Sequence, residues 1–136
     1  MTAKEFLQQA WEIDQRIDAK VEERDRLNEK LTAARIGAYS AMPRGGAHDW
    51  TDAAAHVADL SVEIDAEIRE LCRIKRLVNE AINAVEVVKY RRVLELRYRN
   101  YMDWEKIAET LGYELRWVYE LHGRALLRVK VPEEFA

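Results

Sequence analysis

The sequence is poor in the residues that interrupt helices or cross-link chains. Among its 136 residues are two prolines, five glycines and one cysteine. A single cysteine excludes an intrachain disulfide and a metal site built from cysteines alone. We expect that residue, Cys72, to pack as a small apolar side chain at a helix interface. Long stretches without proline or glycine favour helix over turns and loops.

Long hydrophobic runs are also absent. No apolar stretch approaches the ~20 residues that a membrane-spanning helix needs, and no basic segment followed by an apolar run marks a signal peptide. The sequence therefore predicts a soluble, cytoplasmic protein without a membrane partner. It contains no zinc-site spacing, no phosphate-binding glycine loop and no nucleophile elbow. We expect no metal, no cofactor and no enzymatic activity.

Charge is abundant, at 35% of residues, and it is unevenly distributed. Residues 89–130 contain ten lysines and arginines against six acidic residues, a local charge of +4. Because the whole chain carries −3, the remainder carries −7. This asymmetry is expected of a protein that meets phosphate groups with one end only.

Apolar residues recur at helical spacing in the first third of the chain. Leu7, Ala10, Ile17, Val21 and Leu31 follow one another at steps of three, seven, four and ten, all sums of threes and fours, which predicts a helix over about residues 3–39. Thr2 and Glu5 have the spacing of a capping box at its start. Three polar residues fall on or near the stripe and are of the kind that fixes register in a coiled coil: Asp14, Arg24 and Asn28.

A second helix is predicted over about residues 51–88, after a break that contains Pro43 and the Gly45–Gly46 pair. Its apolar residues alternate at steps of three and four over four heptads, interrupted only at Glu67, which is typical of a coiled coil. These are Val57, Leu60, Ile64, Leu71, Ile74, Val78, Ala81, Val85 and Val88. The loop lets the two helices pair as an antiparallel hairpin over residues 1–88. A hairpin alone leaves apolar surface uncovered, so we expect a homodimer; alternatively, the C-terminal helices pack over it.

The heptad pattern ends after Val88, and three shorter helices are predicted over residues 89–131, followed by a tail over 132–136. We expect them at Tyr90 to about Tyr101, Trp104–Leu111 and Leu115–Val129. Asp103 can cap the second helix, and Gly112 can take the left-handed conformation of a sharp turn after it. Five residues form the predicted core of this helix-turn-helix unit: Ile107, Ala108, Leu111, Gly112 and Val118. The predicted fold is all-α throughout.

The C-terminal run resembles the DNA-binding region 4 of sigma-70-type factors, which reads the −35 promoter element. The resemblance rests on Leu96-Arg97-Tyr98, Trp104-Glu105-Lys106-Ile107-Ala108, Leu111-Gly112, Val118 and Arg124-Ala125. The start Met1–Leu7 and the Met42-Pro43-Arg44-Gly45-Gly46 segment make the whole chain similar to phage late-operon transcriptional regulators of the ArpU type. These resemblances imply a sigma-region-4-like helix-turn-helix and a role in regulating transcription in phages or mobile elements.

In a helix-turn-helix the second helix enters the major groove of double-stranded DNA, so the recognition helix is expected at about residues 115–129. Four residues of that helix are candidates for base contacts: Arg116, Trp117, Glu120 and Arg124. Five basic residues are candidates for phosphate contacts: Arg97, Arg99, Lys106, Arg128 and Lys130. RNA polymerase is a further candidate partner.

Two alternative functions stay open on the sequence. Small terminase subunits, which package DNA, also join a helix-turn-helix to a coiled-coil part. The chain is alternatively a coiled-coil protein-interaction module with a degenerate helix-turn-helix. Glu114 motivates this last alternative, because a serine commonly caps the recognition helix at that position and glutamate caps less well.

Overall fold

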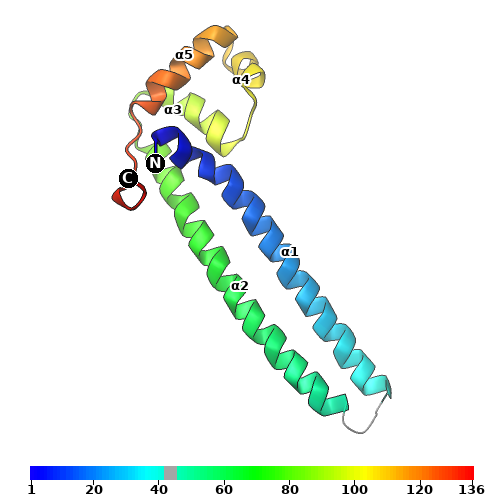
Figure 1. The fold of residues 1–136 in the computed structure, drawn as a ribbon. Helices are drawn as coiled ribbons and strands as arrows, with labels where there is room; N and C mark the ends of the chain where they lie inside the picture. Colours follow the sequence, from blue (N-terminus) through cyan, green and yellow to red (C-terminus); the bar gives the residue numbers. More distant parts are fainter. Residues whose placement is uncertain (42–45) are drawn as a thin grey trace. The chain divides into compact units, whose positions relative to one another are not determined.

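The computed structural model describes the backbone of residues 1–41 and 46–136, and all side chains in these ranges except those of residues 34, 35, 37–41, 46–51 and 53. The described part is all-helical and contains no strand, as the sequence predicts (Figure 1). Its elements are α1 (Ala3–Ala41), α2 (Gly46–Asn83), α3 (Val88–Leu94), the π-helical turn η1 (Glu95–Arg99), α4 (Trp104–Leu111), α5 (Leu115–Leu126) and the 3₁₀ turn η2 (Glu133–Phe135). Residues 42–45 of the predicted interhelical break lie outside the described residues.

The start of α1 is capped as the sequence predicts. The backbone N–H of Glu5 donates to Oγ1 of Thr2 at 3.2 Å. The backbone N–H of Thr2 donates in return to Oε2 of Glu5 at 3.4 Å. This reciprocal pair satisfies two N–H groups that a helix start otherwise leaves without an acceptor.

The second long helix is displaced from the predicted range at both ends. It begins at Gly46 rather than at residue 51, and it ends at Asn83 rather than at residue 88. Beyond Asn83 the chain turns, and the Val85 N–H bonds to the Ile82 carbonyl at 3.1 Å, three residues back. Val85 is buried, whereas Val88 is 67% exposed at the start of α3. The continuous heptad prediction is therefore wrong for Val88, because the turn rotates that residue out of the apolar stripe.

The described chain forms two compact units. One unit comprises residues 15–71, the central parts of α1 and α2; the other comprises residues 1–14 together with 72–136. The ends of both long helices thus belong to the same unit as the C-terminal helices. The predicted boundary at residue 88 does not coincide with this division, because the hydrophobic contacts of the helix ends are made with the C-terminal helices.

In the unit of residues 15–71, α1 and α2 run antiparallel. Lys20 Nζ lies 2.8 Å from Glu67 Oε2, and Arg24 Nη1 lies 2.7 Å from Asp65 Oδ1, so partner numbers fall as α1 advances. Arg24, one of the polar residues on the predicted stripe, is therefore part of an interhelical ion pair. Ile64 and Leu71 are buried here. Other apolar residues of this unit, on or beside the predicted stripes, are only half-buried: Ile17, Val21, Leu27, Leu31, Val57, Leu60 and Ile68.

In the other unit, the C-terminal helices cover the apolar faces at the ends of α1 and α2. One buried cluster joins residues from α1, α2 and the turn after it, α3, η1 and α5: Phe6, Leu7, Ala10, Val78, Ile82, Val85, Leu94, Tyr98 and Ala125. The alternative in which the C-terminal helices pack over the hairpin thus holds for this part of it. Asp14, on the predicted stripe, pairs with Lys75 at 2.5 Å and accepts a hydrogen bond from the Tyr101 hydroxyl.

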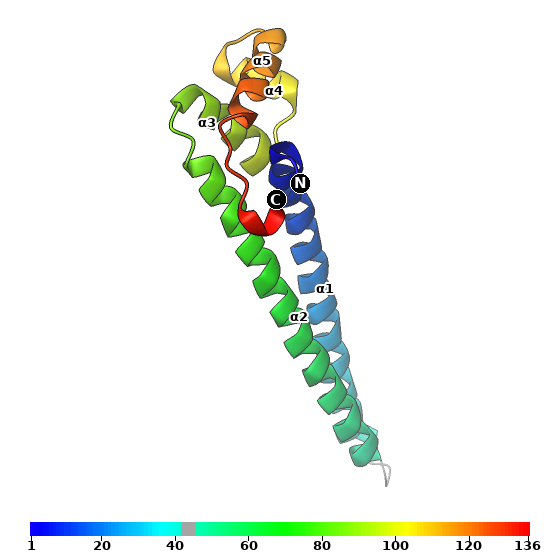
Figure 2. The same ribbon diagram turned by 60° about the vertical axis from the view of Figure 1, so that its left-hand side comes forward.

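The C-terminal tail belongs to the same unit. The Phe135 ring packs on the Phe6 ring with 5.2 Å between centroids, and Figure 2 shows η2 beside the first turns of α1. Glu134 accepts two hydrogen bonds from the Arg73 guanidinium, at 3.0 and 3.1 Å. The tail therefore contributes to the core of this unit.

The helix predicted from Tyr90 to about Tyr101 is not uniform. It is α-helical only to Leu94 and continues as the π-helical turn η1, in which the Asn100 N–H bonds to the Glu95 carbonyl five residues back. Tyr101 then ends the segment with φ of +57°. The wider turn buries both Leu96 and Tyr98, so core packing rather than regular helix geometry determines the path of the chain here.

Two further predictions require correction. The last predicted helix reaches only Leu126 rather than Val129, because the chain changes to bonds from the Arg128 and Val129 N–H groups to carbonyls three residues back. Cys72 is exposed rather than packed at a helix interface. Its place beside the buried Leu71 leaves it on the solvent side of α2.

Candidate nucleic-acid interface

Helices α4 and α5 are joined by a sharp turn whose chemistry the sequence predicts. The Asp103 carboxylate accepts from the Lys106 N–H at 2.8 Å and caps α4. Gly112 ends α4 with φ of +71°, in the left-handed region that a side chain disfavours. The Tyr113 N–H then bonds to the Ala108 carbonyl at 3.0 Å. Residues 112–114 thus form a hydrogen-bonded turn that fixes α5 relative to α4.

A second buried cluster lies between α4, α5 and η1. It contains Leu96, Ile107, Ala108 and Val118, with Leu111 packed against it. Val118 and Ile107 are fully buried, and the small Ala108 lies at the contact of the two helices. The residues expected to form the helix-turn-helix core thus lie in one apolar cluster, with Gly112 in the turn.

One face of α5 points to solvent along its whole length. The face opposite the buried Val118 carries residues spaced by four, three and four positions, which keeps them on one line of a helix. All four are exposed: Arg116, Glu120, Gly123 and Leu127. Two of the expected base contacts, Arg116 and Glu120, therefore lie on the outermost line of the helix.

The other two expected base contacts join Glu120 in a side-chain cluster on the flank of α5. The Arg124 guanidinium donates from Nη2 to Glu120 Oε1 at 2.8 Å. The same guanidinium stacks over the Trp117 ring, 5.3 Å from its centroid. Trp117 is half-buried, whereas Glu120 and Arg124 are exposed. Glu120 and Trp117 together therefore orient the Arg124 side chain.

Three of the expected phosphate contacts are exposed side chains: Lys106 on α4, and Arg128 and Lys130 after the end of α5. These three charged groups are exposed to water. Basic groups in such positions can neutralise the phosphates of a polyanion, which then releases its condensed counterions.

The other two expected phosphate contacts, Arg97 and Arg99, have partners within the protein. Arg97 stacks on the Trp104 ring at 4.5 Å and donates from Nη1 to the Met102 carbonyl at 2.9 Å. Arg99 donates to Asn83 Oδ1 at 3.0 Å, at the end of α2. Both are half-buried. Both guanidinium groups are therefore engaged by acceptors within the protein, unlike the three exposed basic side chains.

Behind α5, a buried histidine links the two clusters. His122 is 8% exposed, and its Nε2 lies 2.6 Å from the hydroxyl of Tyr98. The Trp104 ring packs edge-on to the imidazole, with 4.5 Å between centroids. Burial, together with the positive charges of Lys4 and Arg97, lowers the pKa of His122 to about 4. Burial also raises the pKa of Tyr98 to about 12. The pair is therefore neutral at neutral pH.

Sequence reasoning overlooked Gly123, which lies on the exposed line of α5. A methyl group built on it meets no atom within 4 Å, so no contact within this protein requires glycine there. Glycine in a helix interior costs stability relative to alanine. The signal available in the sequence was a glycine inside an otherwise regular helical pattern.

Among the residues whose side chains the structure describes, no group of three or more metal-ligating side chains occurs. The described residues contain no helix that is long and apolar enough to cross a membrane. Comparison of the chain with known protein families, curated proteins and solved structures found no match.

Proposed function

We propose that this protein is a sequence-specific DNA-binding transcriptional regulator of the phage or mobile-element type. In this proposal α4, the turn at Gly112 and α5 act as a helix-turn-helix, and α5 is the recognition helix. The observation that carries the proposal is the exposed face of α5 with Arg116, and its flank with Arg124, on a helix fixed to α4 by a shared apolar cluster.

The proposed base contacts follow from side-chain chemistry. Arg116 offers a planar fork that matches the O6 and N7 acceptors of guanine, and Glu120 can accept from a cytosine amino group. Arg124 is ion-paired with Glu120 in the unbound protein. If Glu120 accepts from cytosine, Arg124 is released toward the DNA, with Trp117 still stacked beneath it.

The proposed phosphate contacts are Lys106, Arg128 and Lys130, which are exposed. Arg97 and Arg99 are left out of this set because both guanidinium groups have acceptors within the protein. Phosphate contacts position a protein on the duplex and make its affinity depend on salt.

We propose further that the chain acts as a homodimer through the hairpin of residues 15–71. The half-buried apolar residues along α1 and α2 support this proposal, because a second hairpin would bury them. Two recognition helices on one dimer would bind two half-sites and raise affinity through effective concentration.

The decisive experiment recovers genomic DNA fragments bound by the full chain and compares the wild type with the Arg116→Ala/Arg124→Ala variant. Loss of the enriched sites in the variant is expected, since each bidentate arginine contributes about 1–3 kcal/mol of discrimination. Arg16→Ala/Arg26→Ala is the matched control, because it removes the same charge from exposed positions of α1. Recovery of the same sites by both α5-altered and wild-type protein would refute α5 as the recognition helix.

One observation favours the alternative of a protein-interaction module. Glu114 stands at the N-cap of α5 without making a side-chain cap hydrogen bond. Absence of salt-dependent duplex binding by the wild type would support that alternative. For the terminase alternative the oligomeric state decides: light scattering that gives a ring of about eight or more chains supports DNA packaging, whereas a dimer supports regulation.

A further inference from the structure

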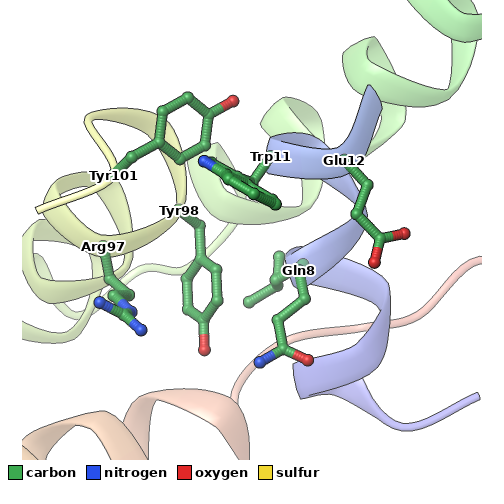
Figure 3. Close-up of a pocket in the computed structure, with 7 residues that line it drawn as sticks. Gln8, Trp11, Glu12, Arg97, Tyr98 and Tyr101 are labelled. Atoms are coloured by element: carbon green, nitrogen blue, oxygen red, sulfur yellow. The ribbon is translucent and has the colours of Figure 1, made fainter. Parts of the chain in front are cut away.

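A cavity of about 400 Å³ opens between the first turns of α1 and the turn η1, within one compact unit (Figure 3). Gln8, Trp11 and Glu12 line it from α1, and Arg97, Tyr98 and Tyr101 line it from the opposite side. Its volume lies within the usual range of sites that hold small molecules. None of the proposed DNA contacts lines this cavity.

The backbone on the η1 side of the cavity is irregular in two ways. Arg97 and Tyr98 lie in the π-helical turn, a geometry that is rare and frequently found at functional sites. Tyr101 has φ of +57°, the one positive φ of a non-glycine residue in the described chain. Its hydroxyl donates to the Ala10 carbonyl at 3.1 Å and bonds to Asp14, which fixes η1 against α1. The spacing of the two walls is thus held by specific bonds.

The walls are aromatic. Trp11 is 54% exposed although it lies next to a buried apolar cluster, and Figure 3 shows its indole between the Tyr101 and Gln8 side chains. The Tyr98 ring forms the inner wall, with its hydroxyl tied to His122. Aromatic walls in a small cavity favour a planar ring, which stacks on them or meets them edge to face.

The polar groups of the cavity give it a direction. The Arg97 guanidinium is oriented by its stacking on Trp104 and by its bond to the Met102 carbonyl. Arg97 is the one basic residue among the described residues that line the cavity, so this end is the cationic one. Glu12 lies at the other side, on α1, and the Gln8 amide lies between (Figure 3). An anionic group is therefore favoured at Arg97 and disfavoured at Glu12.

We propose that this cavity is a binding site for a small planar aromatic carboxylate, whose ring packs between Trp11 and Tyr98 and whose carboxylate bonds to Arg97. The site is independent of the proposed DNA interface. Arg97 also contacts Met102 and Trp104, at the start of α4. A ligand bound to Arg97 would therefore touch the side chain that packs against the start of this helix.

The test uses the full chain and three probes that share one ring: indole-3-acetate, neutral indole and cationic tryptamine. Saturation-transfer NMR and a titration of amide shifts measure binding. Indole-3-acetate is expected to bind with a dissociation constant near or below about 1 mM. It is expected to bind about tenfold more tightly than tryptamine, a difference in binding free energy of about 1.4 kcal/mol. Perturbed amides are expected at Gln8, Trp11 and Tyr98.

Two variants separate the ring from the charge. Trp11→Ala removes a half-exposed side chain and is expected to weaken all three probes, whereas Arg97→Gln is expected to remove the preference for the carboxylate. Tyr113→Ala, which removes an exposed aromatic outside the cavity, is the control and should leave binding unchanged. Equal affinity for the three probes, undiminished binding to Trp11→Ala, or no binding below about 10 mM would each overturn the proposal. DNA binding is measured separately, so either proposal can fail alone.

Discussion

The buried pair of His122 and Tyr98 makes stability depend on pH. In the unfolded chain His122 binds a proton below its ordinary pKa of 6.5, whereas in the folded protein it does so only near pH 4. Between these values the unfolded state holds more protons. The free energy of unfolding is therefore expected to fall as pH drops from about 6.5 to about 4, by roughly 2–3 kcal/mol.

Urea denaturation of the wild type and of His122→Gln across this range measures the effect. Glutamine keeps an acceptor for the Tyr98 hydroxyl but does not titrate. The His122→Gln variant should therefore lose less stability on acidification than the wild type. His56→Gln, at an exposed histidine, is the control and should match the wild type. Identical pH profiles for all three proteins would contradict the assignment.

The two glycines at Gly112 and Gly123 should respond oppositely to alanine. Gly123 has open space around it and lies within a helix, so Gly123→Ala is expected to stabilise the protein by about 0.5–1 kcal/mol. Gly112 has φ of +71°, so Gly112→Ala is expected to destabilise the protein by about 1–2 kcal/mol. Thermal denaturation compares them. Weaker DNA binding by the more stable Gly123→Ala would mean that DNA approaches α5 closely at this position.

At the scale of the element, α4 and α5 start differently. The Asp103 side chain caps α4, whereas Glu114 makes no side-chain cap bond to α5. Asp103→Ala is therefore expected to cost about 1 kcal/mol, and Glu114→Ala close to nothing. Glu114→Ser should stabilise the protein by supplying the missing cap. Chemical denaturation of the three variants decides this, and an equal cost for both alanine changes would contradict it.

The elements differ in how much of them the sequence could reveal. The bounds of α4 and the start of α5 were predicted because Asp103 and Gly112 mark them chemically. The end of α2 was missed because residues 84–87 contain neither proline nor glycine, and Val85 and Val88 continue the apolar spacing. The turn there is imposed by burial of Val85 in the core. The π-helical turn was missed for the same reason, since Leu96 and Tyr98 also fit an ordinary helix.

The candidate site divides in the same way. Arg116 and Glu120 could be placed on the outer face of a helix from periodicity alone. The internal partners of Arg97 and Arg99 could not, because they depend on contacts with residues distant in sequence or beyond the helix end, such as Asn83 and Met102. The cavity between α1 and η1 could not be foreseen either, since its walls lie about 90 positions apart in the sequence.

At the scale of the whole molecule, the tail closes one compact unit. Phe135→Ala is expected to destabilise that unit by roughly 1–2 kcal/mol, because it removes the ring that packs on Phe6. Glu133→Ala, at an exposed neighbouring position, should have little effect. Urea denaturation, monitored by tryptophan fluorescence, measures both variants. Equal midpoints for Phe135→Ala and the wild type would show that the Phe135 ring contributes no stability.

The contact of Phe6 with Phe135 also has a consequence for synthesis on the ribosome. Phe6, Leu7 and Ala10 leave the ribosome well before Ala125 and Phe135, which help to cover them. Until then that apolar face of the nascent helix has no native cover from the C-terminal helices. Exposed apolar surface of this kind invites aggregation and chaperone binding. This unit therefore completes its folding only after its C-terminal helices and Phe135 have been translated.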